Sequence, residues 1–180
     1  MTKISDFIAK LKSCPPGLNG WKMFEDICIE ILIFLLVPPL EMPRIQPRTH
    51  SGIDRRDAIF PNRNFDLENT WGKIHQELNA RLILFEFKNY DKSEIGKEDV
   101  NQVRNYLTEP MGKLGILCCN KKPIESAYIK RNSIYSSSEK KVILFITKEH
   151  LIEMLYIKER GEDPADLIMD MIEIFYMEYE

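Results

Sequence analysis

The sequence lacks the features that mark several large classes of protein. None of its eight glycines forms a glycine-rich phosphate loop, so binding of a nucleotide cofactor is not expected. The longest apolar run short of proline, Ile31 to Val37, is far below the roughly 18–20 residues of a membrane span. The charges of Asp6, Lys10 and Lys12 interrupt the first residues, whereas a secretory signal has an uninterrupted apolar stretch there. These absences predict a cytoplasmic protein with no membrane partner.

Cysteine and histidine are also scarce, and neither shows the spacing of a metal site. The adjacent pair Cys118 and Cys119 would point to opposite faces of a strand. All four cysteines are expected to be reduced, small apolar residues. His75 lies in a polar segment and is expected to be exposed.

What the chain does contain is typical of a globular protein. It has 180 residues, of which 44% are hydrophobic and 29% are charged, and this excludes disordered, collagen-like and coiled-coil classes. The length favours one domain over residues 1–180. Within it we distinguish a helical lead-in at 1–19 and acidic helices at 148–180.

Charge is distributed unevenly along the chain, whose net charge is −3. Residues 1–148 contain 23 Lys and Arg against 18 Asp and Glu, a balance of +5. Residues 149–180 contain 2 against 10, a balance of −8. Local fields decide what docks on a surface, so the basic body is compatible with nucleic acid despite the net acidity. The alternative is a solvated surface with scattered charges.

Hydrophobic periodicity predicts helices that alternate with strands. Ser5 is expected to cap a first helix, and a second follows from about residue 20 to the prolines at 38 and 39. Two short strands over 42–60, joined by a turn at Ser51-Gly52, precede a helix around Trp71. This order predicts an α/β fold, a mixed sheet with helices on both faces. Further strands are expected over 81–90, 114–119 and 141–147, and further helices over 98–107, 123–133 and from 148 onward.

The strand over 81–90 contains two charges where a buried strand should have none. Glu86 and Lys88 share a face with Leu84, because side chains alternate along a strand. Asp57 begins the neighbouring strand, so two carboxylates and a lysine would lie together in an oxygen site suited to Mg²⁺. Such a site serves metal-assisted hydrolysis of a phosphodiester. The alternatives are a Glu–Lys pair at a frayed strand end and a salt-bridged turn at residues 55–57.

Several segments resemble the motifs of the PD-(D/E)XK, or restriction-endonuclease-like, nuclease superfamily. They are SGIDRRD followed by AIF, then FEFKNY, then VNQVRNYL, with GWKMFEDICIEIL resembling the family's first helix. The resemblance covers the chain from about Gly20 to the final helix. It implies a restriction-endonuclease-like three-layer core, dependence on Mg²⁺ with Mn²⁺ as a substitute, and cleavage of DNA. The family's proline-aspartate pair is absent, since Arg56 precedes Asp57.

The resemblance also implies roles for individual residues. Asp57 and Glu86 match the metal carboxylates, Lys88 the catalytic lysine and Gln102 a glutamine near the site. The backbone carbonyl of Phe87 is expected to join the metal ligands. Glu25 matches the first-helix glutamate, as a metal ligand, with Glu30 as the alternative, and Asp54 is a rival to Asp57. Contacts to nucleic acid are expected from Arg55, Arg56 and Asn89.

The sequence therefore predicts a Mg²⁺-dependent endonuclease that cleaves DNA in bacterial restriction or antiphage defence. One alternative is a non-catalytic module of the same fold that binds nucleic acid or protein. Another is a nuclease that cleaves RNA, which the motifs do not separate from DNA. A second copy of the chain and a separate regulatory protein both remain open as partners.

Overall fold

The chain folds around a five-stranded mixed sheet with the strand order β1-β2-β3-β4-β5. The computed structural model describes residues 3–47 and 56–180. β2 pairs antiparallel with β1 and β3, whereas β3, β4 and β5 run parallel. The strands are Arg44–Ile45 (β1), Ala58–Pro61 (β2), Leu82–Lys88 (β3), Leu114–Cys119 (β4) and Val142–Thr147 (β5).

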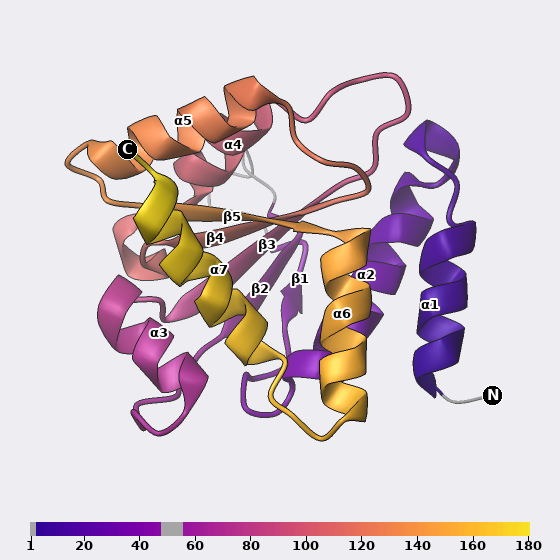
Figure 1. The fold of residues 1–180 in the computed structure, drawn as a ribbon, viewed down its shortest axis with the longest axis horizontal. Coiled ribbons are helices and arrows are strands. Elements are labelled where there is room, and N and C mark those ends of the chain that lie inside the picture. The colour runs from indigo at the N-terminus through magenta and orange to yellow at the C-terminus, as the bar shows by residue number, and fades with distance from the viewer. Residues whose placement is uncertain (1–2, 48–55) are drawn as a thin grey trace.

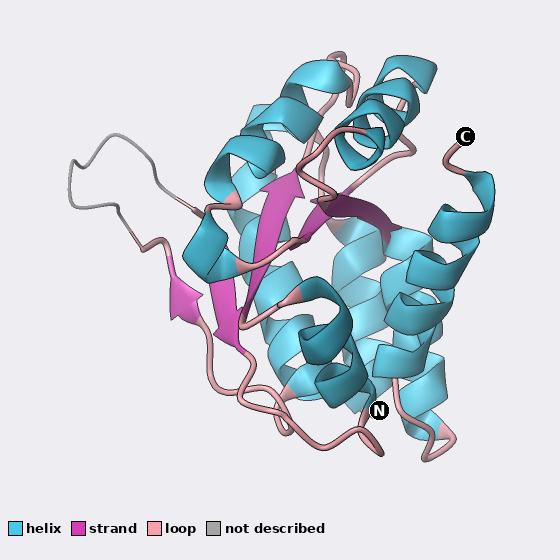
Figure 2. Cartoon of the chain, turned by 90° about the vertical axis from the view of Figure 1, so that its left-hand side faces the viewer, coloured by secondary structure: helices cyan, strands magenta, loops and turns pink. Residues whose placement is uncertain are grey.

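Helices cover both faces of this sheet and make a three-layer α/β fold, as the sequence predicts (Figures 1 and 2). Helices α4 and α5 pack on one face, and the remaining helices pack on the other. Two short 3₁₀ turns, η1 (Gly17–Asn19) and η2 (Glu109–Met111), connect elements. The helices are Lys3–Ser13 (α1), Trp21–Leu36 (α2), Thr70–Leu78 (α3), Lys97–Tyr106 (α4), Glu125–Ser136 (α5), Lys148–Glu159 (α6) and Ala165–Glu178 (α7).

Alternation along the strands divides the core into two hydrophobic clusters. On β3, Phe85 and Phe87 belong to the cluster beneath α2, while Leu84 belongs to the cluster beneath α4. The adjacent Cys118 and Cys119 likewise enter opposite clusters, and all four cysteines are free and buried. Residues of β4 and β5 are buried throughout, as expected of interior parallel strands.

The long separation of Asp57 from Glu86 is occupied by α3, which the Trp71 pattern predicts. Asn69 caps this helix by accepting a hydrogen bond from the N–H of Trp71 at 2.8 Å. Trp71 is fully buried and anchors the helix against the core. The antiparallel register then returns the chain beside β2, pairing Ala58 with Phe85.

Three local predictions are wrong. Helix α1 begins at Lys3, so Ser5 lies inside the helix rather than at its cap. β3 ends at Lys88, two residues before the predicted end, because the following backbone leaves the sheet to begin the connection to α4. His75 is buried rather than exposed, since its ring packs on Phe65 with the ring centroids 4.7 Å apart.

The predicted turn at Ser51-Gly52 and the rival carboxylate Asp54 lie outside the described residues. Within the described ranges 3–47 and 56–180, no helix is both long and apolar enough to cross a membrane.

Candidate functional site

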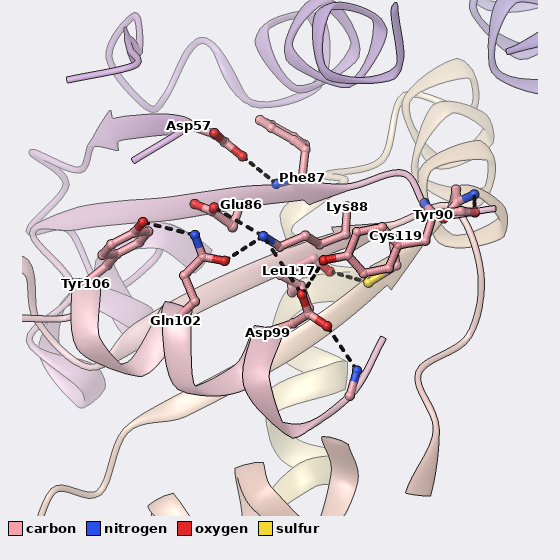
Figure 3. Close-up of polar contacts among 12 residues, drawn as sticks. Asp57, Glu86, Phe87, Lys88, Tyr90, Asp99, Gln102, Tyr106, Leu117 and Cys119 are labelled. Atoms are coloured by element: carbon pink, nitrogen blue, oxygen red, sulfur yellow. Dashed lines mark hydrogen bonds and ion pairs between the residues drawn. The ribbon is translucent and has the colours of Figure 1, made fainter. Parts of the chain in front are cut away.

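Two carboxylates meet where β2 begins and β3 ends. Asp57 precedes the pair of Ala58 and Phe85, so its side chain reaches the last residues of β3. Its Oδ2 accepts a hydrogen bond of 2.9 Å from the backbone N–H of Phe87 (Figure 3). Glu86 is only 2% exposed, and among the described residues its Oε2 has no hydrogen-bond partner. The fold therefore buries a carboxyl group beside a second one.

The surroundings of Glu86 oppose its ionisation. Burial is the largest cause, and the neighbouring carboxylate of Asp57 adds to it, so the pKa of Glu86 is raised from 4.5 to about 8. The ammonium of Lys88 lowers this pKa in part, with Nζ lying 3.7 Å from Oε1 of Glu86. A cation bound between the two carboxylates would remove the remaining repulsion.

Lys88 is held in place by side chains from α4. Its Nζ donates a hydrogen bond of 2.5 Å to Oε1 of Gln102 and lies 3.9 Å from Oδ1 of Asp99 (Figure 3). Gln102 is fixed in turn, because its Nε2 donates to the hydroxyl of Tyr106 at 3.0 Å. Asp99 accepts a hydrogen bond of 2.7 Å from the hydroxyl of Tyr90. The lysine head group is thus oriented from the helix that covers this face of the sheet.

The backbone carbonyl of Phe87 points to the side of β3 on which Asp57 lies. The carbonyl of Lys88 accepts a hydrogen bond from the N–H of Asn120, on the side of β4. Backbone groups of successive strand residues point to opposite neighbours, so the carbonyl of Phe87 points toward β2. Its N–H, which bonds Asp57, points the same way.

These oxygen donors fit a divalent cation of the Mg²⁺ type. Mg²⁺ usually binds one or two carboxylates and keeps several waters, so Asp57 and Glu86 suffice as charged ligands. The unpartnered Oε2 of Glu86 and the raised pKa of its carboxyl are both features that a bound divalent cation would relieve. No group of three or more His, Cys, Asp or Glu side chains within 3–47 and 56–180 is arranged to share a metal ion.

Glu25 lies on α2, outside this pair of carboxylates. It is 3% exposed, and its Oε1 accepts hydrogen bonds from Lys22 at 3.0 Å and from Gln46 at 2.9 Å. The backbone N–H of Gln46 donates to the backbone carbonyl of Asp57 at 2.8 Å, so Glu25 is linked to the site through one residue. The alternative, Glu30, is exposed and pairs with Lys10. Of the two glutamates, Glu25 is the one connected to Asp57, through Gln46.

The residues predicted to contact nucleic acid differ in their surroundings. Arg56 donates a hydrogen bond of 3.2 Å to the backbone carbonyl of Tyr106, and its guanidinium lies 5.6 Å from the centre of the Tyr106 ring. Asn89 is 7% exposed, and its amide donates to the carbonyl of Pro15 at 2.9 Å. These contacts join segments of the chain that are distant in sequence. The predicted contacts of both residues to nucleic acid stay predictions. Arg55 lies outside the described residues.

The sequence reasoning missed Asp99 and Tyr106. Both lie on the same helical face as Gln102, three residues before it and four residues after it. That spacing was available in the sequence, and once Gln102 is placed beside Lys88 it would have identified both. Gln46 gave no comparable signal, because its contact with Glu25 depends on the path of the chain after β1.

Comparisons with known proteins agree with this fold. No protein-family model matches the chain. A solved structure, the small subunit (R.BspD6I2) of the heterodimeric restriction endonuclease R.BspD6I, superimposes with a TM-score of 0.54. The match covers 96% of this chain and 88% of that subunit, at 13% sequence identity.

One curated protein is similar in sequence. It is an Escherichia coli (strain K12) protein of 80.3 kDa named after transposon gamma-delta, 28% identical over 114 residues. The match covers 63% of this chain but only 16% of the length of that relative. The chain itself gathers two carboxylates and a lysine at the end of β3, and the structural match shows that it has a restriction-endonuclease-like α/β fold.

Proposed function

We propose that the chain is a Mg²⁺-dependent endonuclease that hydrolyses phosphodiester bonds of DNA. The observation that carries this proposal is the buried carboxyl of Glu86, whose pKa is raised by burial and by Asp57 and which lies 3.7 Å from the ammonium of Lys88. Burying a carboxyl group this deeply is costly for a purely structural role. At the end of β3, in a fold shared with a restriction endonuclease subunit, the same groups would serve to bind a metal ion and act on a phosphodiester.

The proposed metal ligands are the carboxylates of Asp57 and Glu86 and the carbonyl of Phe87. When bound, Mg²⁺ would polarise the phosphate and stabilise charge on the leaving oxygen. Glu25 is linked to this region through Gln46, so we assign it the positioning of the segment that carries Asp57.

Lys88 has the central role among the protein's own groups. We propose that its ammonium donates hydrogen bonds to the attacking water and the phosphate, while the water oxygen bonds to phosphorus and the bond from phosphorus to the sugar oxygen breaks. The attacking water releases its proton to solvent, and the leaving sugar oxygen takes a proton from solvent. Gln102 orients this ammonium, and Asp99 offsets part of its charge. Both therefore act as positioning residues rather than on the substrate.

A substrate panel tests the choice of nucleic acid. End-labelled duplex DNA, single-stranded DNA and structured RNA of equal length are incubated with Mg²⁺, with Mn²⁺ and with EDTA. We expect cleavage of DNA with either metal, no cleavage in EDTA, and a loss of at least about 100-fold for Lys88→Ala. Cleavage of RNA alone would replace the proposed substrate, and cleavage in EDTA would contradict the metal ligands.

The alternative is a non-catalytic module of the same fold. The clustering of Asp57, Glu86 and Lys88 argues against it, because binding alone does not require a buried carboxyl group beside a second carboxylate. Titration calorimetry distinguishes the two, since a non-catalytic module has no reason to bind Mg²⁺ at Glu86. The role in bacterial restriction or antiphage defence, and the cytoplasmic location, stay predictions.

One carboxylate pair cuts one strand at a time, so a double-strand break needs a second copy of the chain or a partner. The structural neighbour is a subunit of a heterodimeric enzyme. We therefore propose that this chain also acts with a second subunit, and sedimentation of the protein with and without duplex DNA would reveal a homodimer.

A further inference from the structure

Two apolar side chains are exposed on the connection between α1 and α2. Leu18, in the turn η1, is 90% exposed, and Trp21, the first residue of α2, is 45% exposed. Both line a groove of about 790 Å³ whose opposite wall is the end of β3 and the residues after it. Exposed apolar side chains that gather at a groove are typical of a binding site.

The fold holds this connection firmly against β3. The buried amide of Asn89 donates to the carbonyl of Pro15 at 2.9 Å. At Gly20 there is no room for a side chain, because a Cβ would lie 1.8 Å from the same carbonyl oxygen. Gly17 has a φ of +75°, and its backbone packs against Asp91. Leu18 and Trp21 are therefore held at the surface by a turn that is fixed against β3.

The groove is continuous with the candidate site. Lys88 lines it, together with Tyr90 and Lys92. Its volume lies within the roughly 300–1,000 Å³ of ordinary ligand clefts. A permanent protein partner seated in the groove would lie against Phe87 and Lys88, next to the position proposed for the substrate. The expected occupant is therefore the substrate itself.

We propose that this groove binds an unpaired nucleobase of the strand being cut, stacked on Trp21 and packed against Leu18. The proposal rests on the proposed function, because the phosphate of that strand would lie at Lys88. A combination of an exposed aromatic ring with nearby cations is the usual way to hold single-stranded nucleic acid without reading its sequence. Lys88 and Lys92 supply the cations, and Asp91 is the one acidic residue of the lining in the described part of the chain. Trp21 and Leu18 offer an apolar surface on which an unpaired base can stack, whereas a base within a duplex is already stacked on its neighbours.

Tryptophan fluorescence tests this directly, because the chain has two tryptophans and only Trp21 is exposed. The full chain is titrated with oligothymidylate in EDTA, so that binding is measured without cleavage. We expect quenching by the single strand and little quenching by a blunt duplex of the same length. In Trp71→Phe, where Trp21 is the sole tryptophan, the fractional quenching should increase.

Affinity is then measured by anisotropy of a labelled oligothymidylate. Trp21→Ala should weaken binding roughly 5- to 150-fold, the range expected for loss of one stacked base. Trp21→Phe should restore most of the affinity, because it keeps a ring. Tyr156→Ala, which removes an aromatic side chain of similar exposure (46%) on α6, serves as the matched control and should have no effect.

Two results would overturn the inference. Unchanged affinity of Trp21→Ala for single strands, with duplex cleavage intact, would refute the base site and leave the proposed nuclease function standing. A second copy of the chain in the groove would also refute it, and would appear as a dimer that Leu18→Glu converts to a monomer.

Discussion

Replacing Glu86 with glutamine removes an ionisable carboxyl that the fold buries beside Asp57. In the metal-free protein the pKa of Glu86 is raised to about 8 by burial first and by Asp57 second, whereas in the unfolded chain it returns to about 4.5. Between these values the folded state holds a proton that the unfolded state has released. Rising pH therefore favours the unfolded state of the wild type, and glutamine, which binds no proton, abolishes this effect.

The size of the effect follows from one proton. The free energy of unfolding should fall by about 1.4 kcal/mol for each pH unit in the window between the unfolded-state pKa of Glu86, about 4.5, and its folded-state pKa, about 8. From pH 5 to pH 8 the upper bound is about 4 kcal/mol, because three such units are crossed. We therefore expect Glu86→Gln to gain stability relative to the wild type as pH rises, most of all near pH 8.

The assay is urea unfolding in EDTA at pH 5, 6, 7 and 8. Glu173→Gln, at an exposed glutamate of α7, is the control and should run parallel to the wild type. Asp57→Asn should narrow the window, because it removes the second cause of the raised pKa. If the curves of Glu86→Gln and the wild type run parallel across this range, Glu86 is not buried in the way described.

Four further predictions follow from the geometry. Gln102→Ala should lower the rate of DNA cleavage by about 10- to 100-fold, because a hydrogen bond to a charged group is lost, whereas Tyr106→Phe should cost less; single-turnover rates measure both. Gly20→Ala should destabilise the fold by about 3 kcal/mol in urea unfolding, while Gly96→Ala, where the nearest atom to an added Cβ is 3.4 Å away, should not. The pKa of Glu139 is lowered to about 2, first by Arg104 and then by Lys141, so Glu139→Gln should be slightly less stable at pH 7, and this difference should decline below pH 4.5 and vanish near pH 2. Mg²⁺ at 100 times its Kd should stabilise the wild type by about 2.7 kcal/mol at pH 8 and Glu86→Gln much less, as measured by urea unfolding with and without the metal.

Much of the fold could be predicted because its signals are local. The apolar runs of β4 and β5 and the Trp71 pattern of α3 reflect burial directly, and the alternation of β3 predicts that Glu86 and Lys88 share a face. Element ends were harder, as Ser5 shows, because a helix start depends on which backbone groups are satisfied nearby rather than on one favourable residue.

Contacts within the site could be predicted only where they follow from the regular spacing of side chains along a strand or a helix. The position of Gln102 beside Lys88 follows from the order of strand and helix, and its contact is present. The burial of His75 against Phe65 depends on how the chain turns before α3, which no periodicity encodes. The link from Glu25 to Asp57 through Gln46 is of the same kind.

The groove beside Lys88 is a further example. Leu18 and Trp21 belong to segments far in sequence from β3, and the sequence gives no reason to place them together. Asn89 joins them, because its buried amide ties the connection between α1 and α2 to the end of β3. A residue predicted to contact nucleic acid thus has a structural task that only the three-dimensional arrangement reveals.

Conversion of supercoiled plasmid to nicked circles in the presence of Mg²⁺ tests the central claim most directly. The wild type and Glu173→Gln should both nick the plasmid. In Glu86→Gln and Lys88→Ala the rate of nicking should be lower by at least about 100-fold, although circular dichroism should show that both variants are folded. Equal nicking by all four proteins would contradict the assignment of Glu86 and Lys88, as would nicking that persists in EDTA.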